Sequence, residues 1–275
     1  MASRPSTWRT RPRPLVTLVL MRTHQKGRCH ICGENGDLTK EHVIPSSAGN
    51  RGRLRVNTLA SVKSGWRHGE LFGNGLIRST LCARCNSLCG SYYVPSFALW
   101  TAKAAEYRAK LNNNIGPVLL PFAVNRLMIA KQLAVMTLAM AGADSIDLPH
   151  YQRLRKFVLA PKCRMILRDF TFYTYFHFGP PAFEGVFAAV SMTGGPSPSV
   201  YCHVGIEPLG YTVIGNDAVS VEWAQKLGML NISYFSNCDR LHISVDHLQM
   251  PLLSGAIPLR ASRGDSARDA ILNDE

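Results

Sequence analysis

The chain has 275 residues, a formal net charge of +13 and 46% hydrophobic residues. This length and composition suffice to bury a core and exclude a wholly disordered polypeptide. The longest apolar segments are too short or too interrupted to span a bilayer, and no signal-peptide cleavage site follows the first. We therefore expect a cytoplasmic protein without a membrane partner.

The positive charge is concentrated in the first part of the chain. Residues 1–100 hold 15 Lys and Arg against 4 Asp and Glu, whereas residues 101–275 hold 16 against 14. A strongly basic segment favours a polyanionic partner, because Lys and Arg attract phosphates regardless of base sequence. We expect that partner to be a nucleic acid, with double-stranded DNA as the first choice.

The first part of the chain has few long periodic elements. Residues 1–27 are predicted to be a basic N-terminal arm rich in Arg and Pro, with one short apolar strand over 15–20. Residues 28–96 are rich in Gly, Asn and Ser, which is typical of a small domain held together by a metal ion.

Helices and then strands are predicted in the rest of the chain. In a helical section over 97–162, the periodicity predicts helices at 96–111, 124–141 and 150–159. Residues 163–275 are predicted to be an α+β sheet domain of unknown role with a loose tail. Its strands are expected at 168–178, 185–192, 200–214, 231–235 and 240–245, and its helix at 217–227.

Two pairs of cysteines have the spacing of metal ligands. Cys29 and Cys32 form one C-x2-C pair, and Cys82 and Cys85 form the other. Four thiolates fill the tetrahedral coordination of Zn2+ and leave no open position, so we predict a structural zinc site. The alternative, four ordinary buried cysteines, does not account for the paired spacing. Cys89 is expected to pack as a small apolar residue.

Polar residues with catalytic potential lie close to these pairs. Glu41 and His42 stand between them in the segment Leu38-Thr39-Lys40-Glu41-His42-Val43-Ile44-Pro45, and Asn86 directly follows Cys85. Glu41 and His42 would point to opposite faces of a regular strand, but both could reach one site in a distorted hairpin. Each of the three residues, taken alone, is better explained by a structural role. Their position relative to two cysteine pairs favours a catalytic one.

The motif blocks resemble those of a known family. The segments Cys-His-Ile-Cys-Gly, Leu-Thr-Lys-Glu-His-Val-Ile-Pro-Ser-Ser and Leu-Cys-Ala-Arg-Cys-Asn-Ser-Leu-Cys-Gly are similar to those of zinc-containing HNH endonucleases, over about residues 28–95. The resemblance implies an α+β chain with a small zinc-stapled ββα-metal (treble-clef) module. A helical section and a mainly antiparallel sheet domain would follow that module.

The resemblance also implies the roles of the site residues. His42 corresponds to the general base that activates water, and Glu41 and Asn86 to ligands of one catalytic Mg2+ or Mn2+. The residue types suit this chemistry, because neutral imidazole accepts a proton near neutral pH and hard cations prefer carboxylate and amide oxygens. Glu stands where related sequences often have Asp, which lengthens the reach to the metal by one methylene.

The middle residue of the HNH motif, which orients the catalytic histidine, has no clear match. Asn74 is the favoured candidate because it lies nearest to Cys82, with Asn57 and His68 as alternatives. Basic side chains between the motif blocks are expected to bind phosphates without reading base sequence. They are Arg51, Arg53, Arg55, Lys63, Arg67, Arg78 and Arg84.

Two functions are consistent with these features. The first is an endonuclease that hydrolyses phosphodiester bonds of DNA, in defence against foreign DNA or in a mobile element. The second is a treble-clef zinc module that binds DNA or RNA without cutting it. A homodimer is a further expectation, since two copies would bring two sites to one duplex.

Overall fold

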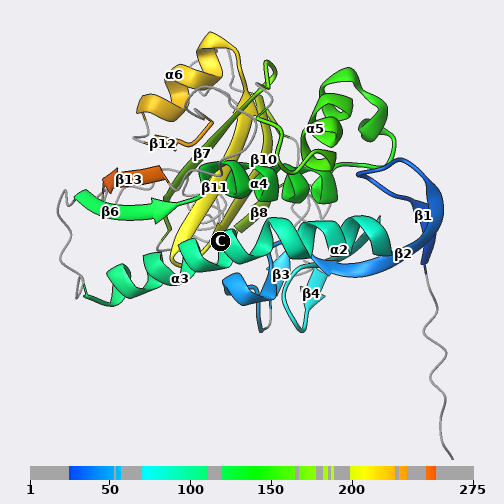
Figure 1. Ribbon diagram of the computed structural model, residues 1–275, viewed down its shortest axis with the longest axis horizontal. Coiled ribbons are helices and arrows are strands. Elements are labelled where there is room, and N and C mark those ends of the chain that lie inside the picture. Colours follow the sequence, from blue (N-terminus) through cyan, green and yellow to red (C-terminus); the bar gives the residue numbers. More distant parts are fainter. Residues whose placement is uncertain are drawn as a thin grey trace, which may run out of the picture.

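The computed structural model describes most of the chain from Gln25 to Pro251. The described residues are 25–52, 54–56, 70–110, 119–164, 167–177, 182–184, 187–188, 199–226, 229–233 and 246–251 (Figure 1). The predicted strand over 15–20 and the predicted tail lie outside them.

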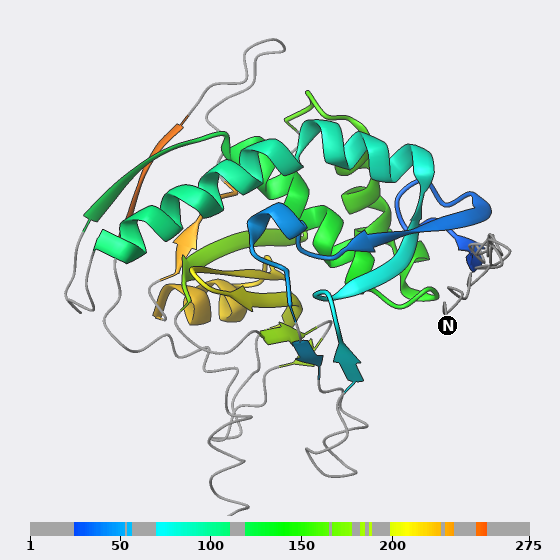
Figure 2. The same ribbon diagram turned by 90° about the horizontal axis from the view of Figure 1, so that it is seen from below.

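A small antiparallel sheet brings the two cysteine pairs together. Its strand order is β1–β2–β5, formed by β1 (Gln25–Arg28), β2 (Asn35–His42) and β5 (Ile77–Cys82). Between β2 and β5 the chain forms the short 3-10 helix η1 (Ser46–Ala48) and an antiparallel ribbon. This ribbon, made of β3 (Leu54–Val56) and β4 (Glu70–Phe72), projects away from the body of the molecule (Figure 2).

A helical layer follows directly after the second cysteine pair. Helix α2 (Ala83–Tyr92) starts next to Cys82 and is succeeded by the long helix α3 (Val94–Lys110), which crosses the molecule (Figure 1). The remaining helices of this layer are α4 (Arg126–Met140) and α5 (Pro149–Leu159), joined through the 3-10 helix η3 (Ser145–Asp147).

The second sheet is larger and also antiparallel, with strand order β12–β7–β11–β10–β8 and β9 paired to β10. Its core face packs against the helical layer, where the ring of Tyr211 lies 5.0 Å from Phe97 and 5.8 Å from Trp100 between centroids. Its elements are β7 (Phe170–Phe176), β8 (Ala182–Glu184), β9 (Phe187–Ala188), β10 (Ser199–Ile206), β11 (Leu209–Gly215), α6 (Ala218–Lys226) and β12 (Leu230–Asn231). A separate pair joins β6 (Leu119–Val124) to β13 (Asp246–Pro251).

Helix α4 forms the centre of the molecule. Every side chain from Leu127 to Ala139 is buried, including the polar residues that interrupt the apolar pattern. The Nζ of Lys131 donates hydrogen bonds to the carbonyls of Phe157 and Ala160, at the end of α5. Burial lowers the pKa of Lys131 to about 7. The buried amino group is accommodated because it caps the carbonyls at the C-terminal end of α5.

No helix in the described part of the chain is long and apolar enough to cross a membrane.

The zinc-motif segment and the later elements share one continuous core. Buried residues from Cys29 to Ile232 belong to a single cluster. Polar contacts join the same parts: the Nδ1 of His30 lies 2.8 Å from the carbonyl oxygen of Leu138, and the Tyr93 hydroxyl donates to the carbonyl of Val158. The chain is therefore a mixed α+β protein in which the cysteine-bearing sheet packs directly on α4 and α5.

The predicted elements are largely present, with shifted boundaries. The helix expected from Ser96 starts at Val94, and the one expected from 124 starts at Arg126, where the Asn125 side chain accepts from the Met128 amide. The predicted cap of α6 is confirmed, because the Ser220 amide donates to Asp217 Oδ1 over 2.8 Å.

One strand prediction and one segment boundary need correction. The continuous strand expected over 200–214 is two strands, β10 and β11, because the chain reverses at Glu207-Pro208. Of the strand expected over 185–192, the structure describes only Phe187 and Ala188, which form β9, and the strand expected over 240–245 lies outside the described residues. The first described strand, β1, occupies Gln25–Arg28 and so begins within the segment assigned to the basic arm.

Candidate functional site

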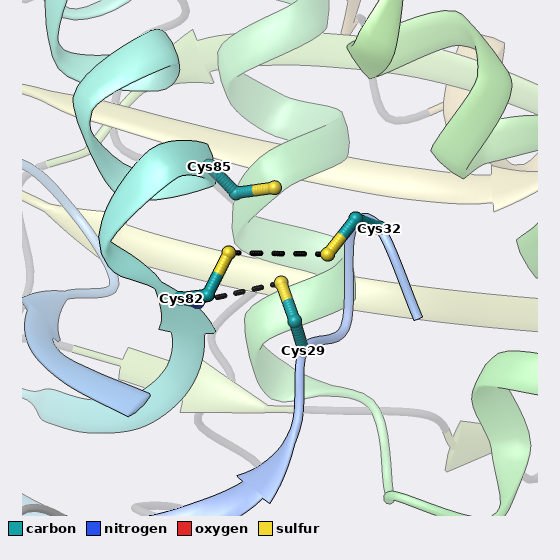
Figure 3. Close-up of side chains that lie close together, drawn as sticks. All are labelled: Cys29, Cys32, Cys82 and Cys85. Atoms are coloured by element: carbon teal, nitrogen blue, oxygen red, sulfur yellow. Dashed lines mark hydrogen bonds between the residues drawn. The ribbon is translucent and has the colours of Figure 1, made fainter. Parts of the chain in front are cut away.

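The four paired cysteines meet at the junction of the small sheet and α2 (Figure 3). Cys29 and Cys32 lie in the turn after β1, which the Gly33 amide closes by donating to the Cys29 carbonyl over 2.8 Å. Gly33 has a φ of 81°, a left-handed conformation that favours glycine. Cys82 ends β5 and Cys85 lies in the first turn of α2.

The distances among the sulfurs match a tetrahedral metal centre. All four Sγ atoms lie within 4.8 Å of one another, and those of Cys32 and Cys82 are 3.8 Å apart. A Zn–S length of about 2.3 Å gives tetrahedral edges of about 3.8 Å. Four cysteine sulfurs in this geometry could hold a metal ion such as zinc, as the spacing predicted.

The electrostatics of the cluster also favour a cation. A hydrogen bond from Cys85 lowers the pKa of Cys29 to about 4, and the same contact raises the pKa of Cys85. Four sulfurs this close cannot all ionise without a compensating positive charge. The positive N-terminal end of α2 supplies part of that charge, and a divalent metal would supply the rest.

Two arginines fix the first cysteine turn to the helical layer. Arg155 of α5 donates from Nε to the Ile31 carbonyl over 2.8 Å, and Arg28 donates to the Gly33 carbonyl over 3.1 Å. Asp147 binds Arg28 over 2.8 Å and lies 4.0 Å from Arg155. The backbone around the cysteines is therefore held by Arg155, which is distant in sequence, and by Arg28, whose side chain is bound by the equally distant Asp147.

His42 lies at the end of β2, where it contacts the turn that leads into β5. Its Nε2 is 3.1 Å from the main-chain carbonyl oxygen of Asn74. A carbonyl oxygen can only accept, so Nε2 carries the proton and Nδ1 is the unprotonated nitrogen of the neutral ring. The ring is partly exposed, which leaves Nδ1 able to take a proton from a bound molecule.

Glu41 is buried on the side of the hairpin that faces α2. Its Oε1 accepts hydrogen bonds from the amide and hydroxyl of Thr80, whereas Oε2 is buried without a hydrogen-bond partner. Burial raises the pKa of Glu41 to about 7 despite the hydrogen bonds from Thr80. An unpaired buried carboxylate oxygen is costly unless a proton or a cation accompanies it.

Asn86 lies on α2, as predicted, and its side chain reaches β2. Its Nδ2 donates to Thr39 Oγ1 over 3.0 Å, which leaves the amide oxygen Oδ1 as the remaining ligand atom. The pairing of β2 with β5 shifts register between Thr39 and Glu41. Among the described residues, no hydrogen bond joins the His42 ring to Glu41 or Asn86. Glu41 and His42 lie at the end of β2, and Asn86 contacts the same strand from α2.

Asn50 is an organising residue that the sequence did not single out. It is fully buried and donates from Nδ2 to the Ile44 carbonyl over 2.8 Å, while its Oδ1 accepts from the Leu76 amide over 2.9 Å. A Cβ on Gly75 would lie 2.2 Å from Asn50 Oδ1. Asn50 thus connects the segment after His42 to the turn that holds Asn74. The only sequence signal is its position after Gly49, next to the Glu-His motif.

The residues predicted to bind phosphate differ in their exposure and in their contacts, and some lie outside the described part of the chain. Arg51 and Arg78 are exposed, and Arg51 donates to the Ser46 carbonyl over 2.8 Å. Arg84 is exposed but lies 3.3 Å from Glu34 next to the cysteines, so part of its charge is offset. Arg55 belongs to β3, and its side chain is not described. Outside the described residues lie Arg53, Lys63 and Arg67, together with the alternative middle residues Asn57 and His68.

Cys89, predicted to be apolar packing, is buried on α2. Burial raises the pKa of its thiol to about 12, which keeps it protonated beside the cluster.

Comparison of the whole chain with protein-family models, with curated proteins and with solved structures finds no match.

Replacing a cysteine of the cluster is expected to destabilise the whole chain. In Cys82→Ser, we expect loss of about one bound zinc per chain and loss of the cooperative thermal transition, because metal binding and folding are coupled. Elemental analysis and differential scanning calorimetry measure the two effects. Cys163→Ser, at an exposed cysteine, is the matched control and should keep both properties. Normal zinc content and melting in Cys82→Ser would contradict the metal centre.

Asn50 and Asn74 are expected to respond differently to substitution. Asn50→Ala should cost about 3 kcal/mol of unfolding free energy, because it leaves the buried Ile44 and Leu76 main-chain groups unpaired. Asn74→Ala should cost less than about 0.5 kcal/mol, because the Asn74 side chain is exposed and its carbonyl belongs to the main chain. Urea titrations of both variants test this difference, and equal losses would refute it.

Proposed function

We propose that this chain is a metal-dependent HNH-type endonuclease that hydrolyses phosphodiester bonds of DNA. The observation that carries the proposal is the contact between His42 and the Asn74 carbonyl, because it leaves Nδ1 of a partly exposed ring as a proton acceptor. A hairpin followed by a helix, stapled by cysteines from a turn and from the helix start, supports a treble-clef module of the ββα-metal type.

His42 would act as the general base. Its Nδ1 would take the proton of a water molecule as that water attacks phosphorus, and the Asn74 carbonyl would stabilise the resulting imidazolium through Nε2–H. The contact uses the main chain, so the middle residue of the motif needs no particular side chain for it. Asn50 would act as a positioning residue, since it ties this carbonyl to the segment after His42.

Glu41 and Asn86 would hold one divalent cation. The fit is supported by the unpaired buried Oε2 of Glu41 and by the Oδ1 of Asn86, both hard oxygen ligands that Mg2+ or Mn2+ prefers. When bound, the cation supplies charge neutralisation at the phosphate and the leaving oxygen. Thr80 and Thr39 orient the two side chains toward that role by fixing Glu41 Oε1 and Asn86 Nδ2.

The substrate assignment rests on charge. Arg51 and Arg78 are exposed on the segments that flank the His42 contact, and they could attract the phosphate backbone without selecting a base sequence. Double-stranded DNA remains the preferred substrate. The alternative is a module that binds nucleic acid without cutting it, and the nicking assay with His42→Ala distinguishes this module from a nuclease.

His42→Ala is expected to slow nicking strongly. We predict that the zinc-loaded protein nicks supercoiled DNA with added Mg2+ or Mn2+, and that the variant is slower by about 100-fold or more, as expected for loss of a general base. Gel assays measure the rate, with linear, single-stranded and RNA substrates in parallel. Imidazole in solution should restore part of the activity. Equal behaviour of both proteins on all substrates would support the binding module instead.

Glu41→Gln is expected to change the pH dependence of stability and the response to metal. The folded-state pKa of Glu41, about 7, lies above its ordinary value. Between the ordinary pKa of a glutamate and pH 7, the native state therefore binds more protons than the unfolded state. In this range wild-type stability falls as the pH rises, by up to about 1.4 kcal/mol per pH unit. Glu41→Gln should lack this decline.

Added Mn2+ should raise the melting temperature of the wild type above pH 7 and leave that of Glu41→Gln unchanged. Thermal melts from pH 5 to 8 at constant zinc measure both effects, with Asp37→Asn, at an exposed position of the same strand, as the control. A Mn2+ shift of equal size in Glu41→Gln would rule out this residue as a ligand.

A further inference from the structure

The two ends of the small sheet differ in how their surface charges are balanced. At the cysteine end, exposed cations have acidic neighbours: Arg84 lies 3.3 Å from Glu34, and Lys26 of β1 is the cross-strand partner of Asp37. An acidic neighbour offsets the charge of a surface cation and weakens its attraction for other anions. The cations at this end are therefore balanced within the chain.

The end that carries His42 lacks such balance. Lys40 and Arg78 are both exposed there, and within the described part of the chain neither of them forms a hydrogen bond or an ion pair. The acidic residue of β2 at this end is Glu41, which is buried and accepts a hydrogen bond from Thr80. The surface beside His42 therefore presents positive charge that is free to attract phosphates.

Lys40 and His42 lie on the same face of β2. Alternate residues of a strand share a face. Thr39 and Glu41 occupy the face toward α2, where Asn86 donates to Thr39 Oγ1 over 3.0 Å. Lys40, which is exposed, and His42, which is partly exposed, therefore share the opposite face.

The irregular pairing of β2 with β5 leaves this alternation intact. Leu81 pairs with Thr39 and Arg78 pairs with Glu41, so β5 contains one residue more than β2 between these two pairs. A β-bulge distorts the strand that carries the extra residue. Strand β2 therefore keeps its period of two. Arg78 shares a face with its partner Glu41 and lies on the face opposite to Lys40.

The spacing of Lys40 and His42 fits two consecutive phosphates of one strand. Positions i and i+2 of a β-strand are roughly 6.6 Å apart, at about 3.3 Å per residue. Consecutive phosphates are separated by one sugar, which spans a comparable length of the nucleic-acid backbone. If the water activated by His42 attacks one phosphate, Lys40 faces the next. A lysine suits this contact, because its compact ammonium group on a flexible stem binds phosphate oxygens without reading a base.

We propose that Lys40 binds the phosphate next to the scissile phosphate on the same strand. It is a positioning residue that takes no part in bond breaking. The contact makes the site select internal phosphodiester bonds of a polynucleotide, because an isolated phosphodiester has no second phosphate to bind. This role rests on the proposed function, in which His42 activates the attacking water.

Duplex oligonucleotides that carry one methylphosphonate, an uncharged analogue of a phosphate, test the contact. A sequencing gel gives the rate at which the full, zinc-loaded chain with Mg2+ cuts each bond. On one side of the methylphosphonate, the wild type should cut the neighbouring bond about 10-fold more slowly than in unmodified DNA, as expected for loss of one charged hydrogen bond. Lys40→Ala should cut that bond equally in both duplexes, and Lys40→Arg should regain the difference.

Arg78→Ala is the matched control on the other face of the hairpin. It removes the same charge, so it should slow the cutting of all bonds by a similar factor and keep the sensitivity to the methylphosphonate. On unmodified duplex, the loss in Lys40→Ala should appear as a higher KM with little change in kcat, because bound substrate and transition state make the contact equally. Circular dichroism and zinc content establish that the variants are folded.

Three results would overturn the role of Lys40. They are a wild type that cuts without regard to the methylphosphonate, a Lys40→Ala variant as sensitive to it as the wild type, and a loss in Lys40→Ala confined to kcat. Each of them leaves the nuclease assignment intact, since the wild type still cuts DNA. A chain that cuts no substrate with any metal would instead refute the proposed function, and the role of Lys40 with it.

Discussion

Convergence of four cysteine sulfurs is the constraint on which the first part of the structure depends. Residues 29–32 and 82–85 are separated by about 50 residues that contain only short strands and one short 3-10 helix in their described part. Closing such a segment costs chain entropy that its own few apolar contacts would not repay. A metal ion bound by the four thiolates would offset that cost, and the antiparallel pairing of β2 with β5 would then follow from the fixed ends.

The cysteine cluster is also connected to the helices in the middle of the molecule. Cys29 and Ile31 are fully buried, and the Ile31 carbonyl accepts from Arg155 of α5. Main-chain carbonyls in a buried turn need hydrogen-bond donors, so these arginine contacts contribute to the stability of the fold. Helix α5 therefore contacts the cysteine turn through Arg155 and contacts α4 through Lys131, which caps its C-terminal end.

What the sequence predicts best is chemistry that depends on local spacing. The cysteine pairs identify their own cluster, and Asp217 marks the start of α6, because both signals act over a few residues. The role of Asn50 was not predictable, since its partners Ile44 and Leu76 meet only after the hairpin closes. The sequence predicts Asn74 as the residue that orients His42 through its side chain, whereas the structure supplies a main-chain carbonyl that any residue carries.

The different environments of Glu41 and His42 follow from strand geometry. Adjacent residues of a strand point to opposite sides, and here the carboxylate is buried toward Thr80 while the imidazole is partly exposed at Asn74. Burial is what a cation ligand requires, because a low dielectric strengthens its attraction for the metal. Access to solvent is what a base that activates water requires. A register shift between Thr39 and Glu41 lies at the position where one strand provides both environments, and a phosphate held between them would connect the two groups without a direct contact.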